Sequence, residues 1–264
     1  MERIYCYYLD SILRLSEFLV SFESLKATNP KYPIACLVGE EIINNNKLFN
    51  FLQELDIILL RNNKQLSEIV YDDNDIKSKW ICSGKLELFR FAQFDKIVYL
   101  DSDTFIVQNV DELFELPSIS MATHSDMELR VNGGVMVISP SENVADKFLM
   151  EREAGIFSKT FKYNFDQDFL SANFTINIMP TIYNTIIPST SELDNFQKSE
   201  VKIWHFGTVK YRYEDATWDE IAADERNKKV LSQIENYLIY FYNVIKKYRE
   251  KYPYIPIAEP VTKF

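Results

Sequence analysis

Short apolar runs alternate with amphipathic stretches through the first half of the chain. Residues 3–9 (RIYCYYL), 32–38 (YPIACLV) and 56–60 (DIILL) are apolar runs of the length expected for buried strands. Between them, residues 11–30 and 40–55 carry apolar residues at three- and four-residue spacing, which predicts amphipathic helices. Strands that alternate with helices predict a parallel sheet that is covered on both faces.

The alternation continues into one acidic turn. Helical spacing over residues 79–94 is followed by the apolar run 97–100, which predicts a strand that ends directly at Asp101 and Asp103. Ligands of open parallel sheets bind at the carboxyl ends of the strands, so both acids are placed where a site would form. Neighbouring carboxylates raise one another's pKa unless a cation lies between them. A solvated acidic turn and a metal site are both compatible with this turn taken alone.

The second half of the chain mixes strands and helices. Residues 118–124, 131–141 and 201–208 have the apolar runs of strands. Residues 141–153 and 164–174 have the pattern of helices.

From about Trp218 the pattern becomes helical. One apolar stripe recurs at three- and four-residue spacing and predicts a packing face, made of Val230, Ile234, Leu238, Phe241 and Ile245. No linker composition interrupts the chain. We therefore expect residues 1–217 to form one α/β domain and residues 218–264 to form a helical extension that packs on this domain or on a partner subunit.

Composition narrows the class of protein. The 264 residues suffice for one large domain with a sizeable core. The formal net charge of −10, without a basic block, excludes nucleic acid as an expected partner. The three scattered cysteines predict reduced, buried thiols. The first residues lack the apolar core of a signal peptide, and no apolar run has the length of a membrane span. We expect a cytoplasmic protein with no membrane insertion.

Two motifs could complete a site around the acidic turn. Paired glycines, Gly133 and Gly134, let a ligand or another backbone approach a strand closely, although a bulge or hairpin turn explains the pair equally well. Asp166, Gln167 and Asp168 form a second acidic cluster beside an apolar helix. Helix capping explains one of these acids but not the whole cluster.

A third motif follows the apolar run near residue 204. His205 is one of only two histidines in the chain, and Gly207 and Lys210 follow it closely. A lone histidine is more often structural than a ligand. Histidine beside carboxylates is nevertheless a common ligand set for Mn²⁺, and glycine with lysine is a usual phosphate-binding pair.

In this order the motifs resemble glycosyltransferase family 8, and within it the glycogenin-like members. The resemblance extends from Ile4 to Lys210 and rests on YLDSDTFIVQNVDELFEL, NGGVMVISPS, FDQDFL and WHFGTVK. It implies a GT-A-type, Rossmann-like fold with a mixed, mostly parallel sheet and helices on both faces. It also implies a Mn²⁺-dependent, retaining transfer of a hexose, with UDP-glucose as the first choice of donor, to a hydroxyl acceptor.

The resemblance assigns a role to each motif residue. The implied metal ligands are Asp101, Asp103 and His205. The implied donor-binding residues are Lys85, Asp101, Ser102, Asp103, Asp126, Asn132, Gly133 and Gly207, with Tyr7 or Tyr8 against the base. The implied catalytic residues are Asp166, Gln167 and Lys210.

These residue types suit the chemistry. UDP leaves readily only when its charge is neutralised, which a divalent ion and Lys210 would do as the bond breaks. A carboxylate near the anomeric carbon stabilises an oxocarbenium-like state. Asp166 could serve there as a nucleophile or as an electrostatic partner, and the sequence leaves both roles open.

Several alternatives also stay open. UDP-galactose or UDP-xylose could be the donor. The acceptor could be a glycan such as a growing glucan, a lipid, a small molecule or a protein tyrosine. That tyrosine could belong to this chain itself. A homodimer is expected from the resemblance. A haloacid-dehalogenase-type phosphatase also carries Asp-x-Asp after a strand, but Phe105 stands where that family has Thr or Val. A sugar-nucleotide-binding protein that kept the fold without catalysis is the last alternative. The motif residues present together argue against it, namely Asp101, Asp103, His205, Asp166 and Lys210.

Overall fold

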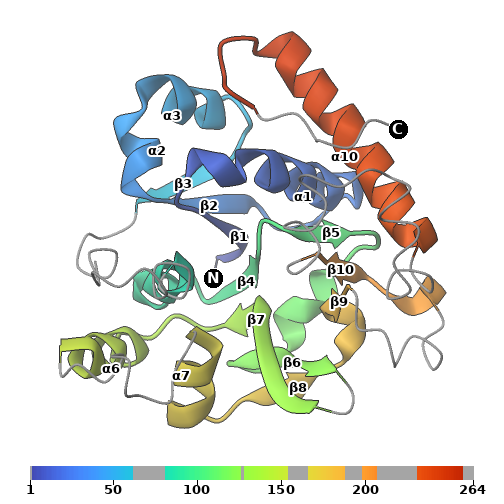
Figure 1. Cartoon of the computed structure of the whole chain (residues 1–264). Coiled ribbons are helices and arrows are strands. Elements are labelled where there is room, and N and C mark those ends of the chain that lie inside the picture. The colour runs from blue at the N-terminus through green and yellow to red at the C-terminus, as the bar shows by residue number, and fades with distance from the viewer. Residues whose placement is uncertain are drawn as a thin grey trace, which may run out of the picture.

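A seven-stranded mixed sheet forms the centre of the molecule, in the strand order β3-β2-β1-β4-β7-β6-β8 (Figure 1). The computed structural model describes residues 2–61, 81–125, 128–153, 166–187, 198–206 and 231–257. The strands of this sheet are β1 (Arg3–Leu9), β2 (Ile34–Val38), β3 (Ile58–Arg61), β4 (Lys96–Leu100), β6 (Ser120–Ser125), β7 (Glu128–Ile138) and β8 (Asn177–Met179).

Parallel pairing dominates this sheet. The neighbours β3, β2, β1 and β4 all run parallel, and Tyr5 at the centre of β1 is in register with Ile34 on one side and Val98 on the other. β7 runs antiparallel to β4 and β6, and β8 pairs parallel with β6. The mixed, mostly parallel sheet expected from the sequence is confirmed. The strand order changes direction between β1 and β4, and open sheets of this kind bind their ligands in a crevice at that point.

Helices and 3₁₀ helices connect the strands. They are α1 (Leu15–Ala27), α2 (Glu40–Asn44), α3 (Asn46–Gln53), α6 (Glu142–Glu153), α7 (Asp166–Asn173), α10 (Leu231–Lys251), η1 (Ile12–Arg14), η2 (Ile81–Arg90), η3 (Asp111–Glu115), η4 (Thr181–Tyr183) and η5 (Lys198–Glu200). The single helix predicted over residues 40–55 is two helices. Asn45 separates them, because its side chain accepts a hydrogen bond from the Leu48 N–H and starts α3.

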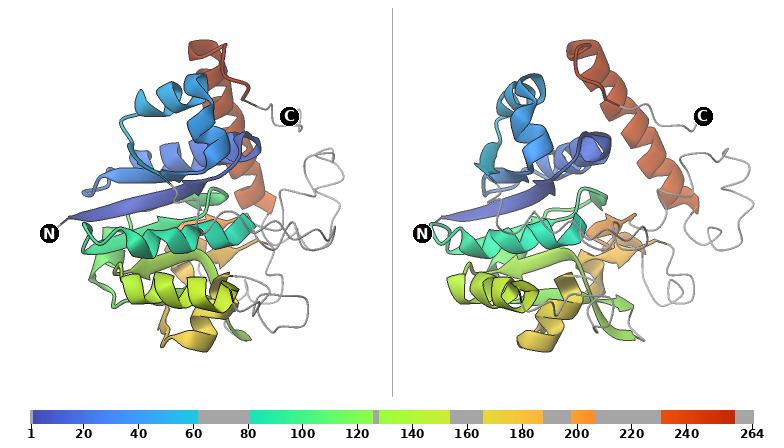
Figure 2. Two further views of the ribbon diagram at one scale, coloured as in Figure 1. Left: turned by 90° about the vertical axis from the view of Figure 1, so that its left-hand side faces the viewer. Right: turned by 60° about the vertical axis from the view of Figure 1, so that its left-hand side comes forward.

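Side chains of β1 alternate between two cores, one on each face of the sheet. Tyr5, Tyr7 and Leu9 belong to the core that α1, α3 and α10 complete. Ile4 and Cys6 belong to the core that η2, α6 and α7 complete. Successive residues of a strand point to opposite faces, so one short apolar sequence serves both cores. Figure 2 shows the two groups of helices on opposite sides of the sheet.

A second, three-stranded sheet lies at the carboxyl edge of the first. Its order is β5 (Thr104–Ile106), β10 (Ile203–His205) and β9 (Thr185–Ile186), with β10 antiparallel to β5 and parallel to β9. The sequence predicted β10 but neither β5 nor β9, because runs this short show no periodicity. This sheet places His205 opposite Thr104, directly beside the acidic turn.

α10 packs its apolar stripe on α1. Ile234, Leu238 and Ile245 of that stripe are buried in the core they share, as the helical spacing predicted. Tyr237 stacks on Phe206 with ring centroids 3.8 Å apart, which ties α10 to the end of β10. The expected boundary between residues 217 and 218 lies outside the described residues, so the division into a domain and an extension stays a prediction.

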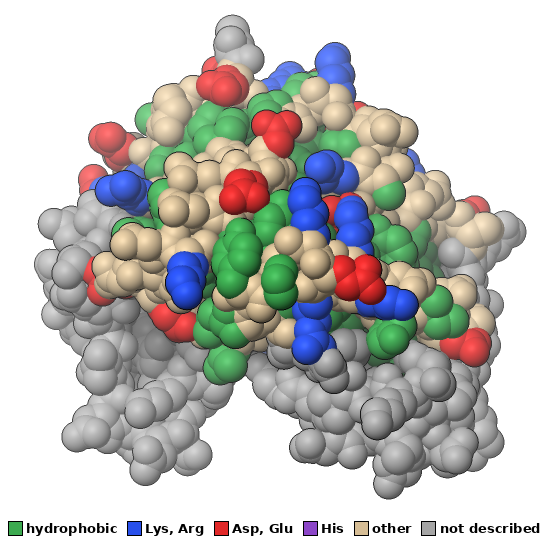
Figure 3. Space-filling view, turned by 90° about the horizontal axis from the view of Figure 1, so that it is seen from above, with side chains coloured by type: hydrophobic (Ala, Val, Ile, Leu, Met, Phe, Trp, Pro, Cys, Tyr) green, Lys and Arg blue, Asp and Glu red, His purple; other side chains and the backbone are tan. Residues whose placement is uncertain are grey.

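The surface carries both signs of charge. Figure 3 shows lysine and arginine side chains interspersed with aspartate and glutamate side chains on the face seen from above. None of the helices in the described part of the chain has the length and hydropathy that a membrane span requires. Cys6 and Cys36 are buried, free thiols, and the side chain of Cys82 lies outside the described ones.

Candidate active site

The acidic turn leaves β4 and reverses into β5. The Asp101 N–H donates to the Gly134 carbonyl at 2.8 Å, which continues the pairing with β7 by one residue. The hydroxyl and the N–H of Thr104 both bond to the Asp101 carbonyl, at 2.8 and 3.2 Å. These bonds close the turn on both sides of Ser102, which is buried. Backbone hydrogen bonds therefore fix the turn that carries the two carboxylates.

Asp101, Asp103 and His205 come together as one cluster. His205 Nε2 lies 3.2 Å from Asp103 Oδ1 and 3.9 Å from Asp101 Oδ2. One ligand atom from each residue lies within 4.8 Å of the others. Two carboxylate oxygens and an imidazole nitrogen are a donor set that suits Mn²⁺ or another divalent ion. The three sequence-predicted ligands thus fit a metal ion at the carboxyl edge of the sheet.

Lys85 is the cation that the acidic turn needs. It extends from η2 and is 4% exposed. Its Nζ lies 3.5 Å from Asp101 Oδ1 and 3.1 Å from Asp166 Oδ2, and it donates to the Gly133 carbonyl at 3.0 Å. The Tyr99 hydroxyl also bonds to Asp101 Oδ1. Since Oδ1 of Asp101 is held in this way, its Oδ2 is the oxygen directed at His205.

Asp166 and Gln167 open α7 and face the paired glycines. Asp166 is buried, and this burial raises the pKa of its carboxyl to about 6 although Lys85 beside it acts in the opposite direction. Gln167 Oε1 accepts a hydrogen bond from the Gly133 N–H at 3.0 Å. Asp168 instead lies near Arg130 at 3.8 Å. Asp166 and Gln167 therefore reach the site, whereas Asp168 does not.

Each of the paired glycines makes room for one site side chain. A Cβ on Gly133 would lie 2.6 Å from Asp166 Oδ2, and a Cβ on Gly134 would lie 2.2 Å from His205 Cε1. The sequence predicted the close approach of a ligand or a backbone at these glycines. The structure shows the close approach of two side chains, one from the candidate metal cluster and one from the Lys85 ion pair, and the donor-binding role of Gly133 stays a prediction.

Tyr7 and Tyr8 of β1 point to opposite faces of the sheet. Tyr7 is fully buried among core residues, and its hydroxyl oxygen accepts a hydrogen bond from Ser21. Tyr7 therefore cannot stack on a base, and this prediction is wrong because the side-chain alternation of β1 turns it inward. Tyr8 is half-buried against Gly84 of η2, where an added Cβ would meet its hydroxyl at 2.1 Å. Its proposed contact with the base stays a prediction.

Three predicted site residues lie outside the described residues. They are Asp126, Gly207 and Lys210. Their roles in binding the sugar and the diphosphate stay predictions.

Sequence reasoning missed three residues of this edge. Tyr99 could have been found, because it stands two residues before Asp101 on the same side of one strand. Asp10 follows β1 at the crevice, and it lies so close to Gly39 that an added Cβ there would meet the Asp10 Cα at 2.9 Å. Asn184 bonds to His205 Nδ1 at 2.9 Å, and nothing in its local sequence signals this contact.

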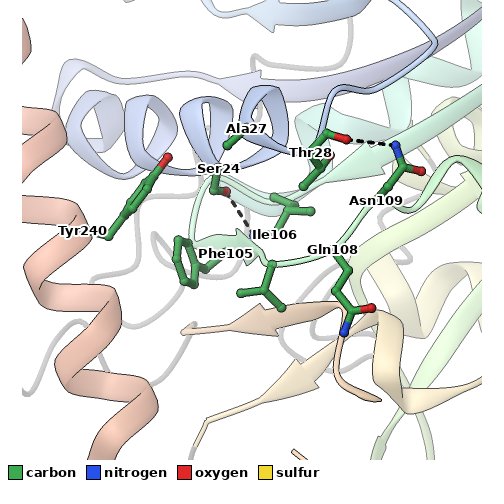
Figure 4. Close-up of a pocket in the computed structure, with 9 residues that line it drawn as sticks. Ser24, Ala27, Thr28, Phe105, Ile106, Gln108, Asn109 and Tyr240 are labelled. Atoms are coloured by element: carbon green, nitrogen blue, oxygen red, sulfur yellow. Dashed lines mark hydrogen bonds between the residues drawn. The ribbon is translucent and has the colours of Figure 1, made fainter. Parts of the chain in front are cut away.

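A separate pocket lies behind β5, between α1 and α10. It has a volume of about 410 Å³, and Figure 4 shows Ser24, Asn109 and Tyr240 among the side chains that line it. Its polar groups already have partners: Ser24 accepts from the Ile106 N–H at 3.0 Å and Asn109 donates to the Thr28 carbonyl at 3.2 Å. None of the site residues described above lines this pocket. We therefore interpret it as space left where α10 packs against α1 and β5.

Known glycosyltransferases are similar to this chain in sequence. No family model matches the chain. Glycogenin of Neurospora crassa is 27% identical over 221 residues, which are 78% of this chain and 30% of that protein. Inositol phosphorylceramide glucuronosyltransferase 1 of Arabidopsis thaliana is 29% identical over 133 residues, which are 47% of this chain and 24% of that protein. The chain thus spans about a third or less of the length of these relatives.

Solved structures show the same fold. The galactosyltransferase LgtC, crystallised with donor and acceptor sugar analogues, superposes with a TM-score of 0.61 at 15% identity, over 89% of this chain and 94% of that one. The glycosyltransferase GlyE of Streptococcus pneumoniae superposes with a TM-score of 0.58 at 18% identity, over 95% of this chain and 64% of that one. The chain therefore has the GT-A fold of these glycosyltransferases and is similar in sequence to glycogenin, in agreement with its resemblance to glycosyltransferase family 8.

Proposed function

We propose that this chain is a metal-dependent glycosyltransferase that moves a hexose from a UDP-sugar to a hydroxyl acceptor with retention of configuration. One observation carries the proposal: a divalent-ion ligand set, a buried lysine and a buried carboxylate converge where the strand order of the sheet changes direction. This edge is where doubly wound sheets bind nucleotides. A haloacid-dehalogenase-type phosphatase does not account for the similarity to glycosyltransferases along most of the chain.

The metal ion would be held by Asp101, Asp103 and His205. When bound, it supplies positive charge that neutralises the diphosphate of the donor as the sugar leaves. The protein contributes the rigidity of this ligand set, because the turn of Asp101 is closed by backbone bonds and His205 is fixed in β10. Lys210 is proposed to add a second positive charge at the diphosphate.

Lys85 and Asp166 would act on the sugar side. Asp166 is a buried carboxylate, and we assign to it the stabilisation of positive charge that develops at the anomeric carbon. Lys85 keeps that carboxylate ionised near neutral pH and holds it at a fixed distance from Asp101. Gln167 and Asn132 are proposed to bond the sugar hydroxyls. In the reaction, the bond from the anomeric carbon to the diphosphate breaks, a bond to the acceptor oxygen forms, and the proton of the acceptor hydroxyl passes to the departing diphosphate or to solvent.

UDP-glucose is the proposed donor, since glycogenin is the relative that matches the largest share of this chain among those reported above. A second candidate is UDP-glucuronate. A UDP-glucuronate:xylan α-glucuronosyltransferase of Arabidopsis thaliana is 39% identical over 104 residues, which favours testing this donor beside glucose, galactose and xylose. A cytoplasmic location agrees with the free thiols Cys6 and Cys36. A homodimer is proposed on the exposed apolar side chains of α10, Ile239 and Tyr242.

Donor hydrolysis and transfer test the proposal. Purified protein is incubated with each UDP-sugar, with Mn²⁺ or with EDTA, and released UDP and intact protein mass are measured. Mn²⁺-dependent release from one donor supports the enzyme, and a mass ladder would add self-glycosylation to it. UDP-sugar binding without release from any donor would instead indicate a sugar-nucleotide-binding protein without catalysis.

A further inference from the structure

The ring of His205 is hydrogen-bonded on the side away from the two carboxylates. Its Nδ1 lies 2.9 Å from Oδ1 of Asn184, a side chain that is 1% exposed. Nδ2 of Asn184 donates to Oδ1 of Asn132 at 2.8 Å, and the same oxygen accepts the backbone N–H of Gly134 at 2.8 Å. One continuous chain of hydrogen bonds therefore runs from the backbone of β7 to the imidazole.

The direction of each bond follows from the first donor. A backbone N–H can only donate, so the atom of Asn132 that faces Gly134 is the amide oxygen. That oxygen can accept only from the amide NH₂ of Asn184, and the remaining amide atom of Asn184, its oxygen, then faces His205. An oxygen acceptor requires a donor on Nδ1. The orientation of an asparagine amide and the tautomer of a histidine usually have to be inferred together from their hydrogen bonds. Here the Gly134 N–H fixes the orientation of both amides and, through them, the tautomer of His205.

We propose that Asn184 is a positioning residue that holds His205 in the Nδ1–H tautomer and so directs the Nε2 lone pair at the divalent ion. The inference rests on the proposed function, which places an ion between His205, Asp101 and Asp103. A partner on the second ring nitrogen of a metal-binding histidine fixes the orientation of the ring and makes the ligand more basic. Gly134 supports this in two ways, because its N–H starts the chain and its missing Cβ leaves space for the ring.

The tautomer can be read by NMR, because the chain has only two histidines. Long-range ¹H–¹⁵N spectra of the imidazole rings are recorded on metal-free protein, at a pH well above the usual histidine pKa of about 6.5. The variant His124→Gln identifies the signal of the other ring. We expect the hydrogen of His205 on Nδ1. An Nδ1 without hydrogen in the wild-type protein overturns the proposal, whatever the activity.

Two substitutions at Asn184 test the effect on the ion. Asn184→Leu removes the acceptor and should weaken Mn²⁺ binding, measured by calorimetry, by about 10–100-fold. Asn184→Asp keeps an oxygen opposite Nδ1, so it should keep the wild-type tautomer and bind Mn²⁺ more tightly than the leucine variant. Thermal unfolding in EDTA identifies the variants that are folded. Wild-type Mn²⁺ affinity in a folded Asn184→Leu overturns the proposal.

Failure of the proposed function gives a different set of results. Wild-type protein that binds Mn²⁺ through an Nδ1–H tautomer of His205, but releases UDP from no donor, contradicts the transfer reaction and supports the role of Asn184. Wild-type protein that binds no Mn²⁺ overturns both. If Asn184→Leu does not fold, the wild-type spectrum still decides the matter.

Discussion

Replacing either of the two glycines of β7 by alanine should impair the site, but each substitution should affect a different property. Neither Gly133 nor Gly134 has φ in the left-handed region, so the backbone accepts alanine and the outcome depends on what the new Cβ meets. At Gly134 the Cβ would lie 2.2 Å from Cε1 and 2.5 Å from Nδ1 of His205, whereas ordinary contact begins at 3.4 Å. The ring must therefore retreat by about 1.2 Å, the difference between 3.4 and 2.2 Å.

A retreat of this size removes His205 from the ligand position. Metal–ligand distances hold to within about 0.2 Å, so a ring displaced several times further no longer coordinates the ion. The same movement strains the bond from Nδ1 to Asn184. For Gly134→Ala we expect Mn²⁺ affinity to fall by at least about 10–100-fold, the range seen when the support of a ligand is lost.

Gly133→Ala is the matched control. Its Cβ would meet Asp166 Oδ2 at 2.6 Å and Lys85 Nζ at 3.3 Å, and neither atom belongs to the metal ligand set. The carboxylate must move by about 0.8 Å, the difference between 3.4 and 2.6 Å. A misplacement of about 1 Å can cost on the order of 100-fold in rate. We expect kcat to fall by this order while Mn²⁺ affinity stays near that of the wild type.

Calorimetry with Mn²⁺ and steady-state UDP release, on both variants and the wild type, separate the two effects. Thermal unfolding in EDTA confirms that both variants are folded. Wild-type Mn²⁺ affinity in folded Gly134→Ala would refute the assignment of His205 as a ligand. Equal loss of Mn²⁺ affinity in both variants would refute the idea that Gly134 makes room for a metal ligand and Gly133 only for Asp166.

Three further predictions follow from single contacts. Asp103→Ala should abolish metal-dependent turnover and leave the far-UV circular dichroism unchanged; full activity would place the ion elsewhere. Asn45→Ala removes the cap of α3 and should lower the free energy of unfolding by about 1 kcal/mol in urea titrations, whereas an unchanged midpoint would contradict the cap. Burial raises the pKa of Asp166 to about 6 from 3.8, so metal-free wild-type protein should lose stability as pH rises between these values. Asp166→Asn should remove this loss of stability with rising pH. If Asp166→Asn differs from the wild type by the same free energy of unfolding at every pH, the raised pKa of Asp166 is contradicted.

The alternation of strands and helices in the first half of the chain was predictable because their periods repeat over many residues. Strand and helix periods alternate over many residues, and the carboxyl end of β4 places Asp101 and Asp103 at the edge where such sheets bind ligands. The motif order then assigned His205, Lys85 and Asp166 to one site, and the structure brings all three together.

Features set by single contacts between distant segments were not predictable. The small sheet that positions His205 consists of strands two or three residues long, and nothing periodic marks β5 or β9. Asn184 lies between η4 and β9, and nothing in its local sequence, TIYNTII, marks a contact with His205. The inward orientation of Tyr7 depends on which face of β1 meets α1, which an apolar run without alternating polar residues does not reveal.

UDP release in Mn²⁺ and in EDTA, compared between wild-type protein and Asp103→Ala, tests the central claim most directly. The account predicts release from a UDP-sugar by the wild type in Mn²⁺ alone, and no release above background by Asp103→Ala under either condition. Equal release by both proteins, or release by the wild type that EDTA does not reduce, would contradict a metal-dependent transferase built on Asp101, Asp103 and His205.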